Sequence, residues 1–418
     1  MGFFLEITFF RMKSNFVKNN KKVVLAFSGG LDTSFCIPYL IENGYKVITL
    51  TVNSGGFTSS ELKEIAEKSK ALGAVKHYTI DSKKAYFDSI IQYIVKTNGL
   101  YEGSYPNIVS SQRYNLVENC IKVAKMEQAH FIANGNSGMG NDQIRFNIPL
   151  KILAPELTLV EPIKDAGGNR EEEKQYLEEK GFQVDKSHKK YSINISLMGV
   201  TYSGSEIDQN LEPDKKVFKW VTGEMVNTEK YFEIEFEKGI PTKLHGKEME
   251  SWKILETLNS EVGKYGFGKD YYTGDCMIGI KGHIVFEAPG ILFLIKAHKA
   301  LEQYVLSKPQ IDFGGLVSKE MTEYIYNGKF YDQHVEALKA FIKKQQENVS
   351  GTVLMKLEHG NAIPVSVKSP YSLIDNSIAI YAQSKSWTKE EVNGFIKLYG
   401  LQTIISSKKQ GLKGDIHL

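Results

Sequence analysis

The stretch Val23-Val24-Leu25-Ala26-Phe27-Ser28-Gly29-Gly30-Leu31-Asp32-Thr33-Ser34 decides the fold of this chain. Its five apolar residues predict a buried strand, and a turn containing two glycines and three hydroxyl residues follows at once. Glycines let the main chain close around an oxyanion, and hydroxyl groups join the free N–H groups of a helix start as donors. A helix is predicted next, because Phe35, Tyr39 and Leu40 recur at helical spacing before a stop at Asn43-Gly44. The segment is therefore predicted to bind phosphate.

This loop differs from the better-known phosphate loops. It lacks the Lys and the spacing of a Walker loop, lacks the glycine pattern of a dinucleotide-binding turn, and carries the acidic Asp32 instead. It resembles the SGGxDS loop of the ATP pyrophosphatases, which hold the pyrophosphate of ATP and transfer AMP. The resemblance implies an ATP site.

Composition and charge limit the other classes of partner. A length of 418 residues exceeds one ordinary core, so two domains and an appendage are expected. With 42% hydrophobic residues, 24% charged residues and a net charge of +3, the chain gives no reason to expect nucleic acid or a membrane. Cys36, Cys120 and Cys276 show no paired spacing, which speaks against a disulfide framework or a zinc ribbon. We expect a cytoplasmic protein without a metal-ligating cluster of its own.

The first residues are not expected to belong to the fold. Residues 1–11 are mostly apolar, but Glu6 interrupts them and no small-residue cleavage site follows, so they fit neither a signal peptide nor a membrane span. We expect residues 1–20 to be a disordered tail. Whether residues 1–11 are genuine stays open.

The pattern along the chain predicts a nucleotide-binding domain over residues 21–185. Strands are expected at 23–27, 47–52, 75–80 and 130–133, with helices at 61–72, 114–126 and 169–180. Alternation of this kind is typical of a doubly wound parallel α/β sheet, whose ligand lies at the carboxyl ends of the strands. Residues 186–385, with β-like runs such as 232–236 and 278–286, predict an α+β domain.

The last residues, 386–418, form a predicted C-terminal helix and tail. Thr388-Lys389-Glu390-Glu391 is a capping box, and Val392, Phe395, Ile396 and Tyr399 share one side of the helix that it opens. Two interpretations stay open, an oligomerisation arm that packs on a neighbouring subunit and a helix that docks on its own domain.

A second glycine-rich segment follows the strand expected at 130–133. It reads Gly135-Asn136-Ser137-Gly138-Met139-Gly140-Asn141-Asp142-Gln143-Ile144-Arg145-Phe146. The glycines allow close approach of the main chain, and the polar residues offer donors, acceptors and both charges. Because both loops follow parallel strands, they are expected at one edge of the sheet.

The two loops together resemble the argininosuccinate synthase family. That family carries A-[YF]-S-G-G-L-D-T-S in its first loop and G-N-D-Q-[VI]-R-F in its second, and both patterns are present here from Ala26 to Ser34 and from Gly140 to Phe146. The resemblance extends over roughly residues 22–400. It implies a PP-loop domain of the ATP-pyrophosphatase type, followed by a synthetase domain and a C-terminal helix.

The resemblance also implies an ATP-dependent ligation in arginine biosynthesis. The ureido oxygen of citrulline attacks the α-phosphate of ATP and releases pyrophosphate, and the amine of aspartate then displaces AMP from citrullyl-AMP to give argininosuccinate. Such chemistry needs positioning and charge stabilisation, with ATP and Mg²⁺ as cofactors. No general base is assigned, and His283 and His298 are left out of the catalytic set. Homotetramers are usual in the family, so a homotetramer is expected here.

The resemblance assigns residues to three parts of the site. ATP contacts fall on Ala26, Phe27, Ser28, Gly29, Gly30, Leu31, Asp32, Thr33, Ser34, Val52, Asn53 and Gly135. Aspartate contacts fall on Ser137, Asn141 and Asp142. Citrulline-side positions are Tyr105, Ser110, Asn141, Arg145, Ser192 and Thr201.

Two citrulline-side positions are altered, which marks a divergent member. Typical members have a Glu that contacts the amino-acid end of citrulline where this chain has Gly274, and a Tyr where it has Phe286. Smaller departures are Asn194 for an Asp, His283 for an Arg, Asn134 for a His and Met139 for a Lys.

The altered pair leaves the acceptor open. Loss of a carboxylate at Gly274 removes a charge and is expected to make room, which points to an N-acylated citrulline such as N-succinylcitrulline. Alternatively Asp275, the next residue, replaces the carboxylate and the acceptor is plain citrulline, the reading that we favour.

Two further classes compete with this reading. A nucleotide-binding paralogue without catalysis would have no use for Asn141, Asp142 and Arg145. Amidating or RNA-thiolating relatives would need an ammonia source or reactive cysteines.

Overall fold

The computed structural model describes residues 21–136, 140–183, 191–276, 279–378 and 386–411. The predicted tail at residues 1–20 and the candidate residue Ser137 lie outside these ranges. The chain divides into two compact units, Met1–Tyr371 and Ser372–Leu418.

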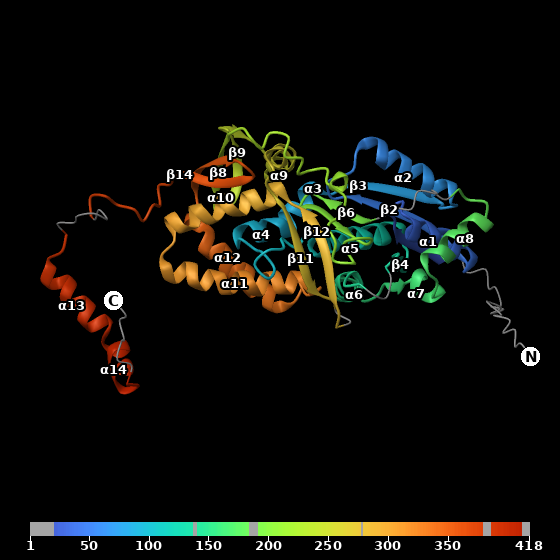
Figure 1. Cartoon of the computed structure of the whole chain (residues 1–418). Coiled ribbons are helices and arrows are strands. Elements are labelled where there is room, and N and C mark those ends of the chain that lie inside the picture. Colours follow the sequence, from blue (N-terminus) through green and yellow to red (C-terminus); the bar gives the residue numbers. More distant parts are fainter. Residues whose placement is uncertain (1–20, 137–139, 184–190, 277–278, 379–385, 412–418) are drawn as a thin grey trace, which may run out of the picture. The chain divides into compact units, whose positions relative to one another are not determined.

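A parallel sheet of five strands forms the first half of the larger unit, in the order β3-β2-β1-β4-β5 (Figure 1). The strands are β1 (Lys21–Ala26), β2 (Tyr45–Asn53), β3 (Lys76–Asp81), β4 (Phe131–Ala133) and β5 (Thr158–Val160). The central strand β1 has Val23, Val24 and Leu25 fully buried, as expected for a parallel strand covered on both faces. The predicted doubly wound sheet is confirmed.

Helices cover both faces of this sheet. On one face α1 (Leu31–Glu42), α7 (Pro162–Ala166) and α8 (Arg170–Glu179) pack on Val23 and Leu25. On the other face α5 (Ile108–Glu127) and α6 (Asp142–Leu153) pack on Val24 and Leu50. Helix α2 (Ser59–Ala71) begins with a capping box between Thr58 and Glu61. Because β1 leads to β2 on one side and lies beside β4 on the other, the carboxyl ends of β1 and β4 form the switch point where ligands bind.

The second half of the larger unit contains two antiparallel sheets. One has the order β11-β12-β7-β6, formed by β6 (Ser192–Ser196), β7 (Gly199–Ser203), β11 (Lys269–Asp275) and β12 (Lys281–Glu287). The other has the order β10-β9-β8-β13-β14. Its strands are β8 (Lys230–Glu237), β9 (Ile240–Leu244), β10 (Lys247–Glu248), β13 (Gly351–Glu358) and β14 (Asn361–Lys368).

The largest core joins these sheets to a set of helices. They are α9 (Ser251–Val262), α10 (Pro289–Val305), α11 (Lys308–Tyr326) and α12 (Gln333–Gln345). The segment α3 (Lys83–Tyr86), a π-helical turn (Phe87–Ile91) and α4 (Gln92–Lys96) also enters this core, although it belongs to the first half of the chain. Helix α5 contributes Ile108 and Tyr114 to this core. It contributes Val117 to the core between the parallel sheet and the helices α5 and α6. Its first turns therefore lie at the junction of the two halves.

The smaller unit contains α13 (Lys389–Tyr399) and α14 (Leu401–Lys409). The predicted capping box is present, because the Thr388 side chain accepts from the Glu391 N–H and the Glu391 carboxylate accepts from the Thr388 N–H. A second helix, which the sequence pattern did not predict, follows directly at Gly400. Throughout the described part of the chain, no helix has the length and apolar character to cross a membrane.

Candidate active site

The first loop joins β1 to α1 with its helix start open. Gly30 is the N-cap residue of α1, and no described side chain caps the helix, so its first N–H groups face the loop. Ser28 Oγ lies 3.2 Å from Thr33 Oγ1 and 3.4 Å from the Gly30 nitrogen, at the mouth of the loop. The predicted ATP contact Ser34 is buried, and its hydroxyl donates to the Gly30 carbonyl at 2.6 Å. Ser28 is the exposed hydroxyl residue of this loop, while the partly buried Thr33 Oγ1 also donates to the Gly30 carbonyl at 3.3 Å.

Helix α2 adds a cation that the loop sequence lacks. Lys68 Nζ donates to the Gly29 carbonyl at 2.7 Å. A β-carbon at Gly29, which has φ +77°, would lie 3.0 Å from the Ile65 side chain, so α2 packs directly on the loop. No local motif marks Lys68, because its loop partner lies 39 residues away.

Two acidic side chains lie behind the loop. Asp32 Oδ1 and Glu173 Oε2 are buried and accept no hydrogen bond from any other described residue, while Arg170 Nε lies 3.6 Å from Asp32 Oδ1. Burial and the nearby Asp32 carboxylate raise the pKa of Glu173 to about 8, so Glu173 holds a proton at neutral pH and interacts with Asp32. Asp32 is therefore the member of this pair that fits Mg²⁺, which binds through one or two carboxylates together with phosphate oxygens. The described residues contain no cluster of three or more metal-ligating side chains.

The second loop touches the first. A β-carbon at Gly135 would lie 3.0 Å from Thr33 Cγ2 and 3.3 Å from the Thr33 nitrogen, so only glycine allows this approach without displacement. The predicted adenosine-side residues Val52 and Asn53 end β2 and are nearly buried, and Asn53 Oδ1 accepts from the Gly55 N–H at 3.1 Å. The structure thus brings both glycine-rich loops together at the sheet edge.

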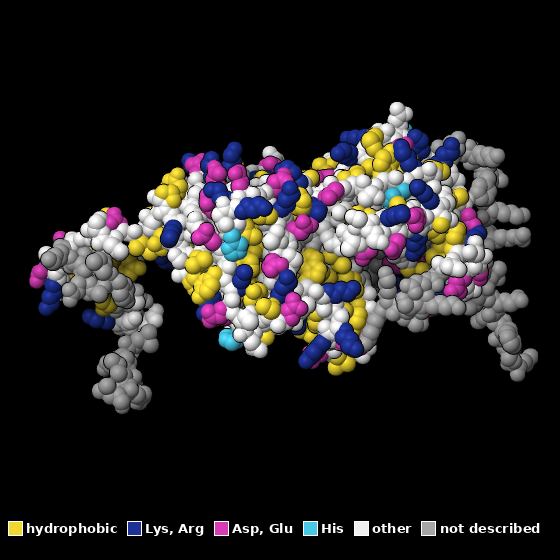
Figure 2. All heavy atoms as spheres, turned by 90° about the horizontal axis from the view of Figure 1, so that it is seen from above, with side chains coloured by type: hydrophobic (Ala, Val, Ile, Leu, Met, Phe, Trp, Pro, Cys, Tyr) yellow, Lys and Arg dark blue, Asp and Glu magenta, His cyan; other side chains and the backbone are white. Residues whose placement is uncertain are grey.

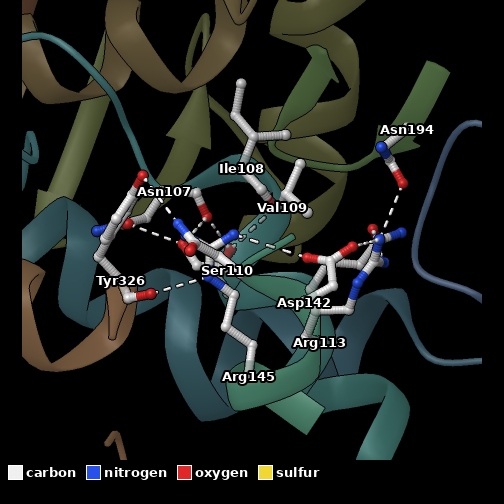
Figure 3. A network of polar contacts seen from close by, with 12 residues as sticks. Asn107, Ile108, Val109, Ser110, Arg113, Asp142, Arg145, Asn194 and Tyr326 are labelled. Carbon is white, nitrogen blue, oxygen red and sulfur yellow. Dashed lines mark hydrogen bonds and ion pairs between the residues drawn. The ribbon is translucent and has the colours of Figure 1, made fainter. Parts of the chain in front are cut away.

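A charged network extends from the second loop (Figure 3). Asp142, at the start of α6, binds Arg113 Nη2 at 2.7 Å and lies 3.6 Å from Arg145 Nη1. Burial alone would raise the pKa of the Asp142 carboxyl, but the two guanidinium groups outweigh it and lower that pKa below its usual value. Arg145 Nε donates to the Tyr326 carbonyl at 2.8 Å, and its guanidinium lies 4.4 Å from the Tyr326 ring centroid. Asp142 is therefore an ionised carboxylate held in place by two cations.

Arg113 is the network residue that the sequence did not reveal. It lies on α5, one turn after the predicted Ser110, and its Nη2 also donates to Asn194 Oδ1 at 2.9 Å. Asn194 is neutral, so Asp142 supplies the carboxylate that pairs with this arginine. No local motif marks Arg113, since its partners lie 29 and 81 residues away.

Strand register gathers several citrulline-side residues on one face of the four-stranded sheet. Asn194 pairs with Thr201, Thr201 with Phe286, and Asp270 with Phe286. Directly paired residues share a face, and so do residues two apart in one strand. Ser192, Asn194, Thr201, Phe286, Tyr272 and Gly274 therefore lie on the same face. The face is joined to α5 through Arg113. It is joined to the segment before α5 through Phe286, whose ring centroid lies 5.5 Å from that of Tyr105.

The remaining predicted residues lie just before α5, in its first turn, or at the N-cap of α6. The Tyr105 hydroxyl accepts from the Val109 N–H at 3.0 Å, and Ser110 Oγ donates to Asn107 Oδ1 at 2.8 Å. Asn141 Nδ2 donates to the Asp275 carbonyl at 3.1 Å. His283 pairs with Thr273 on the opposite face of the hairpin. His298 is buried between Asn98 and Gln346, in line with its omission from the catalytic set.

The room expected above Gly274 is filled. A β-carbon at Gly274 would lie 1.9 Å from the hydroxyl oxygen of Tyr272, two residues earlier on β11. The ring of Tyr272 stacks on Tyr105 with centroids 4.9 Å apart. Asp275, the expected substitute carboxylate, is ion-paired with Lys281 at 2.6 Å, and both side chains are mostly exposed. The surroundings of Gly274 are therefore formed by phenol rings.

Comparisons with known proteins match nearly the whole chain. The family "Arginosuccinate synthase N-terminal HUP domain" matches residues 22–183, and "Arginosuccinate synthase C-terminal domain" matches residues 191–406. An argininosuccinate synthase of Xanthomonas campestris pv. campestris is 40% identical over 393 residues, covering 93% of this chain and 98% of the relative. That of Methanocaldococcus jannaschii is 37% identical over 393 residues, covering 93% and 99%.

Proposed function

The chain belongs to the argininosuccinate synthase family, and we propose that it joins citrulline and aspartate at the expense of ATP, giving argininosuccinate, AMP and pyrophosphate. The observation that carries the proposal is the meeting of the two loops. Gly135 lies against Thr33, and the Asp142–Arg113–Asn194 contacts connect the same place to the sheet face with the citrulline-side residues. This arrangement supports a site in which a phosphate-binding loop lies beside polar side chains that would bind two amino acids.

On the nucleotide side, the open N–H groups of α1 with Ser28 and Thr33 would bind the phosphates. Lys68 and Arg170 contribute positive charge beside the loop. Asp32, with Glu173 behind it, would hold Mg²⁺, which offsets the negative charge of the departing pyrophosphate. Residues 26–34 with Val52, Asn53 and Gly135 remain the proposed ATP contacts.

On the amino-acid side, Asp142 is suited to bind the ammonium group of aspartate, because its carboxylate stays ionised. Arg145 and Asn141, held against Tyr326, would orient citrulline. In the first step a lone pair of the ureido oxygen forms a bond to the α-phosphorus and the bond to pyrophosphate breaks. In the second step the ammonium group of aspartate first gives one proton to water, and the free amine then attacks the ureido carbon while AMP leaves with the electron pair of the C–O bond. Positioning accounts for most of the catalysis that such a site supplies.

The two alternative functions are less well supported. An N-acylated citrulline would need space that the Tyr272 ring occupies above Gly274. A nucleotide-binding paralogue without catalysis would not need the ionised Asp142 between two arginines. We therefore place free citrulline first.

Association and location are also proposals. Helix α13 exposes Phe395, Ile396, Leu398 and Tyr399, whose exposed fractions are 63%, 59%, 72% and 81%. Exposed apolar area of this kind is typical of an interface, and we propose that it mediates a homotetramer. The cysteines are free, which is consistent with a cytoplasmic enzyme.

An omission series tests the function. The protein is incubated with ATP, Mg²⁺ and aspartate, together with citrulline, N-succinylcitrulline or neither, and pyrophosphate release is followed. We expect release with citrulline, with argininosuccinate and AMP appearing in equal amounts. Faster release with N-succinylcitrulline would favour the acylated substrate, and no release in any mixture would favour the paralogue without catalysis.

A further inference from the structure

Tyr272 lies at the centre of a group of four tyrosines beside the proposed citrulline side. Its ring stacks on Tyr105 at 4.9 Å and 17°, and meets the edges of Tyr101 at 6.0 Å and Tyr326 at 6.2 Å. The residue is only 5% exposed. Its side chain is therefore fixed by aromatic contacts on several sides.

The Tyr272 hydroxyl makes no hydrogen bond of regular geometry to a described group, although it is buried. Its nearest polar neighbour is the Tyr326 hydroxyl, and burial together with this hydroxyl raises the pKa of Tyr272. The neighbouring Tyr326 hydroxyl is already engaged by Asn141 Nδ2 and the Asp275 carbonyl. Burial raises the pKa of Tyr272, so the hydroxyl stays protonated and neutral. A buried phenol without a partner costs free energy unless a ligand completes it.

The Tyr272 hydroxyl also occupies the space next to Gly274. It lies where a side chain at residue 274 would begin, 1.9 Å from an ideal β-carbon there. In the resemblance described above, that position carries the Glu that contacts the amino-acid end of citrulline. Tyr272 thus puts a neutral oxygen and an aromatic ring in the place of a carboxylate. Gly274 is needed because any β-carbon would displace the ring.

The charged groups around Tyr272 are of both signs. Asp275 is ion-paired with Lys281, the Glu102 carboxylate adds to the burial that raises the pKa of Tyr272, and the Arg145 guanidinium lies 4.4 Å from the Tyr326 ring centroid. The rings stack in two pairs, Tyr105 on Tyr272 and Tyr101 on Tyr326, so the oxygen lone pair of Tyr272 is the group that can accept a hydrogen bond from an ammonium group. A bulky N-acyl group would instead collide with the ring.

We propose that Tyr272 is a specificity-determining residue of the citrulline side, whose hydroxyl accepts a hydrogen bond from the free α-ammonium group and whose ring excludes N-acylated citrullines. This rests on the proposed function. A hydrogen bond from the α-ammonium group to the Tyr272 hydroxyl would then take the place of the ion pair with Glu that the family resemblance implies at residue 274.

Tyr272→Phe removes only the hydroxyl and keeps the ring. We expect the KM for citrulline to rise about tenfold, as for loss of one hydrogen bond to a charged group, while the KM values for ATP and aspartate stay unchanged. Tyr271→Phe is the matched control, because Tyr271 is 43% exposed on the opposite face of β11. It removes the same atom and should leave all three values unchanged.

Tyr272→Ala tests the exclusion. The wild-type protein should not use N-acetylcitrulline, and the variant should convert it to a product identified by mass. Thermal unfolding of both Tyr272 variants checks that the fold is intact. If Tyr272→Ala does not fold, the wild-type preference for citrulline over N-acetylcitrulline still decides this part.

The outcomes separate the inference from the proposed function. An unchanged KM for citrulline in Tyr272→Phe, or equal wild-type turnover of N-acetylcitrulline, overturns the inference while the proposed function stands. A wild-type protein that forms no product from any citrulline overturns the proposed function. Calorimetric binding of citrulline to wild type and Tyr272→Phe then decides the inference alone, and equal dissociation constants contradict it.

Discussion

The carboxylate of Asp142 lies 2.7 Å from Nη2 of Arg113, and the same nitrogen lies 2.9 Å from Asn194 Oδ1. Arg113 therefore joins the second loop to the sheet face. Arg113→Lys keeps the positive charge, but the lysine ammonium lacks the planar guanidinium that contacts Asp142 and Asn194 together. We expect kcat/KM for aspartate to fall about 10- to 100-fold, equivalent to about 1.4–2.8 kcal/mol, with the KM for ATP unchanged. Steady-state kinetics check this, and equal efficiency of both proteins would contradict it.

Gly135 is predicted to be required for ATP binding. In Gly135→Ala the new methyl group lies 3.0 Å from Thr33 Cγ2 and pushes the first loop from its position. We expect the KM for ATP to rise several-fold, while that for citrulline changes less. Gly315→Ala, on α11, is the control, because its β-carbon meets nothing within 4 Å. Identical ATP kinetics in both variants would show that the loops do not depend on this contact.

Gly274→Ala and Tyr272→Ala are predicted to be non-additive. The methyl group at residue 274 displaces the Tyr272 phenol, so each single variant should lose the same proposed contact with citrulline. In the double variant no ring remains to be displaced, and its KM for citrulline should equal that of Tyr272→Ala. A double-mutant cycle measures this coupling. Independent, additive effects would mean that the ring does not lie over Gly274.

Glu127 is predicted to stabilise the far edge of the parallel sheet in a pH-dependent way. Its carboxylate binds Lys76 Nζ at 2.6 Å and also contacts Tyr78 and Lys22. These contacts, that of Lys76 above all, lower the pKa of Glu127 to about 2. Because the folded-state value lies below the unfolded one, the stabilisation is present above about pH 4.5 and is lost as the pH falls toward 2.

Glu127→Gln should therefore reduce the free energy of unfolding by about 1–2 kcal/mol at pH 7, and the difference should shrink below about pH 4. Denaturant unfolding at several pH values measures both. Glu67→Gln is the control, because Glu67 is 67% exposed and its Lys63 partner lies 4.0 Å away. A difference that grows toward acid would reverse the predicted sign.

The C-terminal helices are predicted to hold subunits together. Replacing Phe395 and Tyr399 by Ser removes two of the largest exposed apolar side chains of α13. Light scattering should report a smaller assembly than for wild type, while Lys397→Ser, on the same helix, leaves the mass unchanged. If the double variant keeps the wild-type mass, α13 does not form the interface.

Much of the nucleotide half could be predicted from the sequence, because its signals are local. The strand before Ser28, the open helix after Gly30 and the second loop near Gly135 each depend on neighbouring residues. Parallel pairing then brings both loops to one edge.

The residues of the proposed amino-acid side could not be predicted in the same way. Arg113 meets partners 29 and 81 residues away, and the face shared by Thr201 and Phe286 depends on antiparallel register. The prediction of free space at Gly274 was wrong, because the Tyr272 side chain fills it. Nothing in the sequence indicates that this ring lies along the strand over the glycine.

The proposed adenylation of citrulline is tested by following its ureido oxygen atom. Citrulline labelled with ¹⁸O in its ureido group is incubated with the protein, ATP, Mg²⁺ and aspartate, and the AMP is analysed by mass spectrometry. If the ureido oxygen attacks the α-phosphate in the site formed by the two loops, the label appears in the phosphate of AMP and argininosuccinate has lost it. Unlabelled AMP, or pyrophosphate release that does not depend on citrulline, would contradict the proposed adenylation.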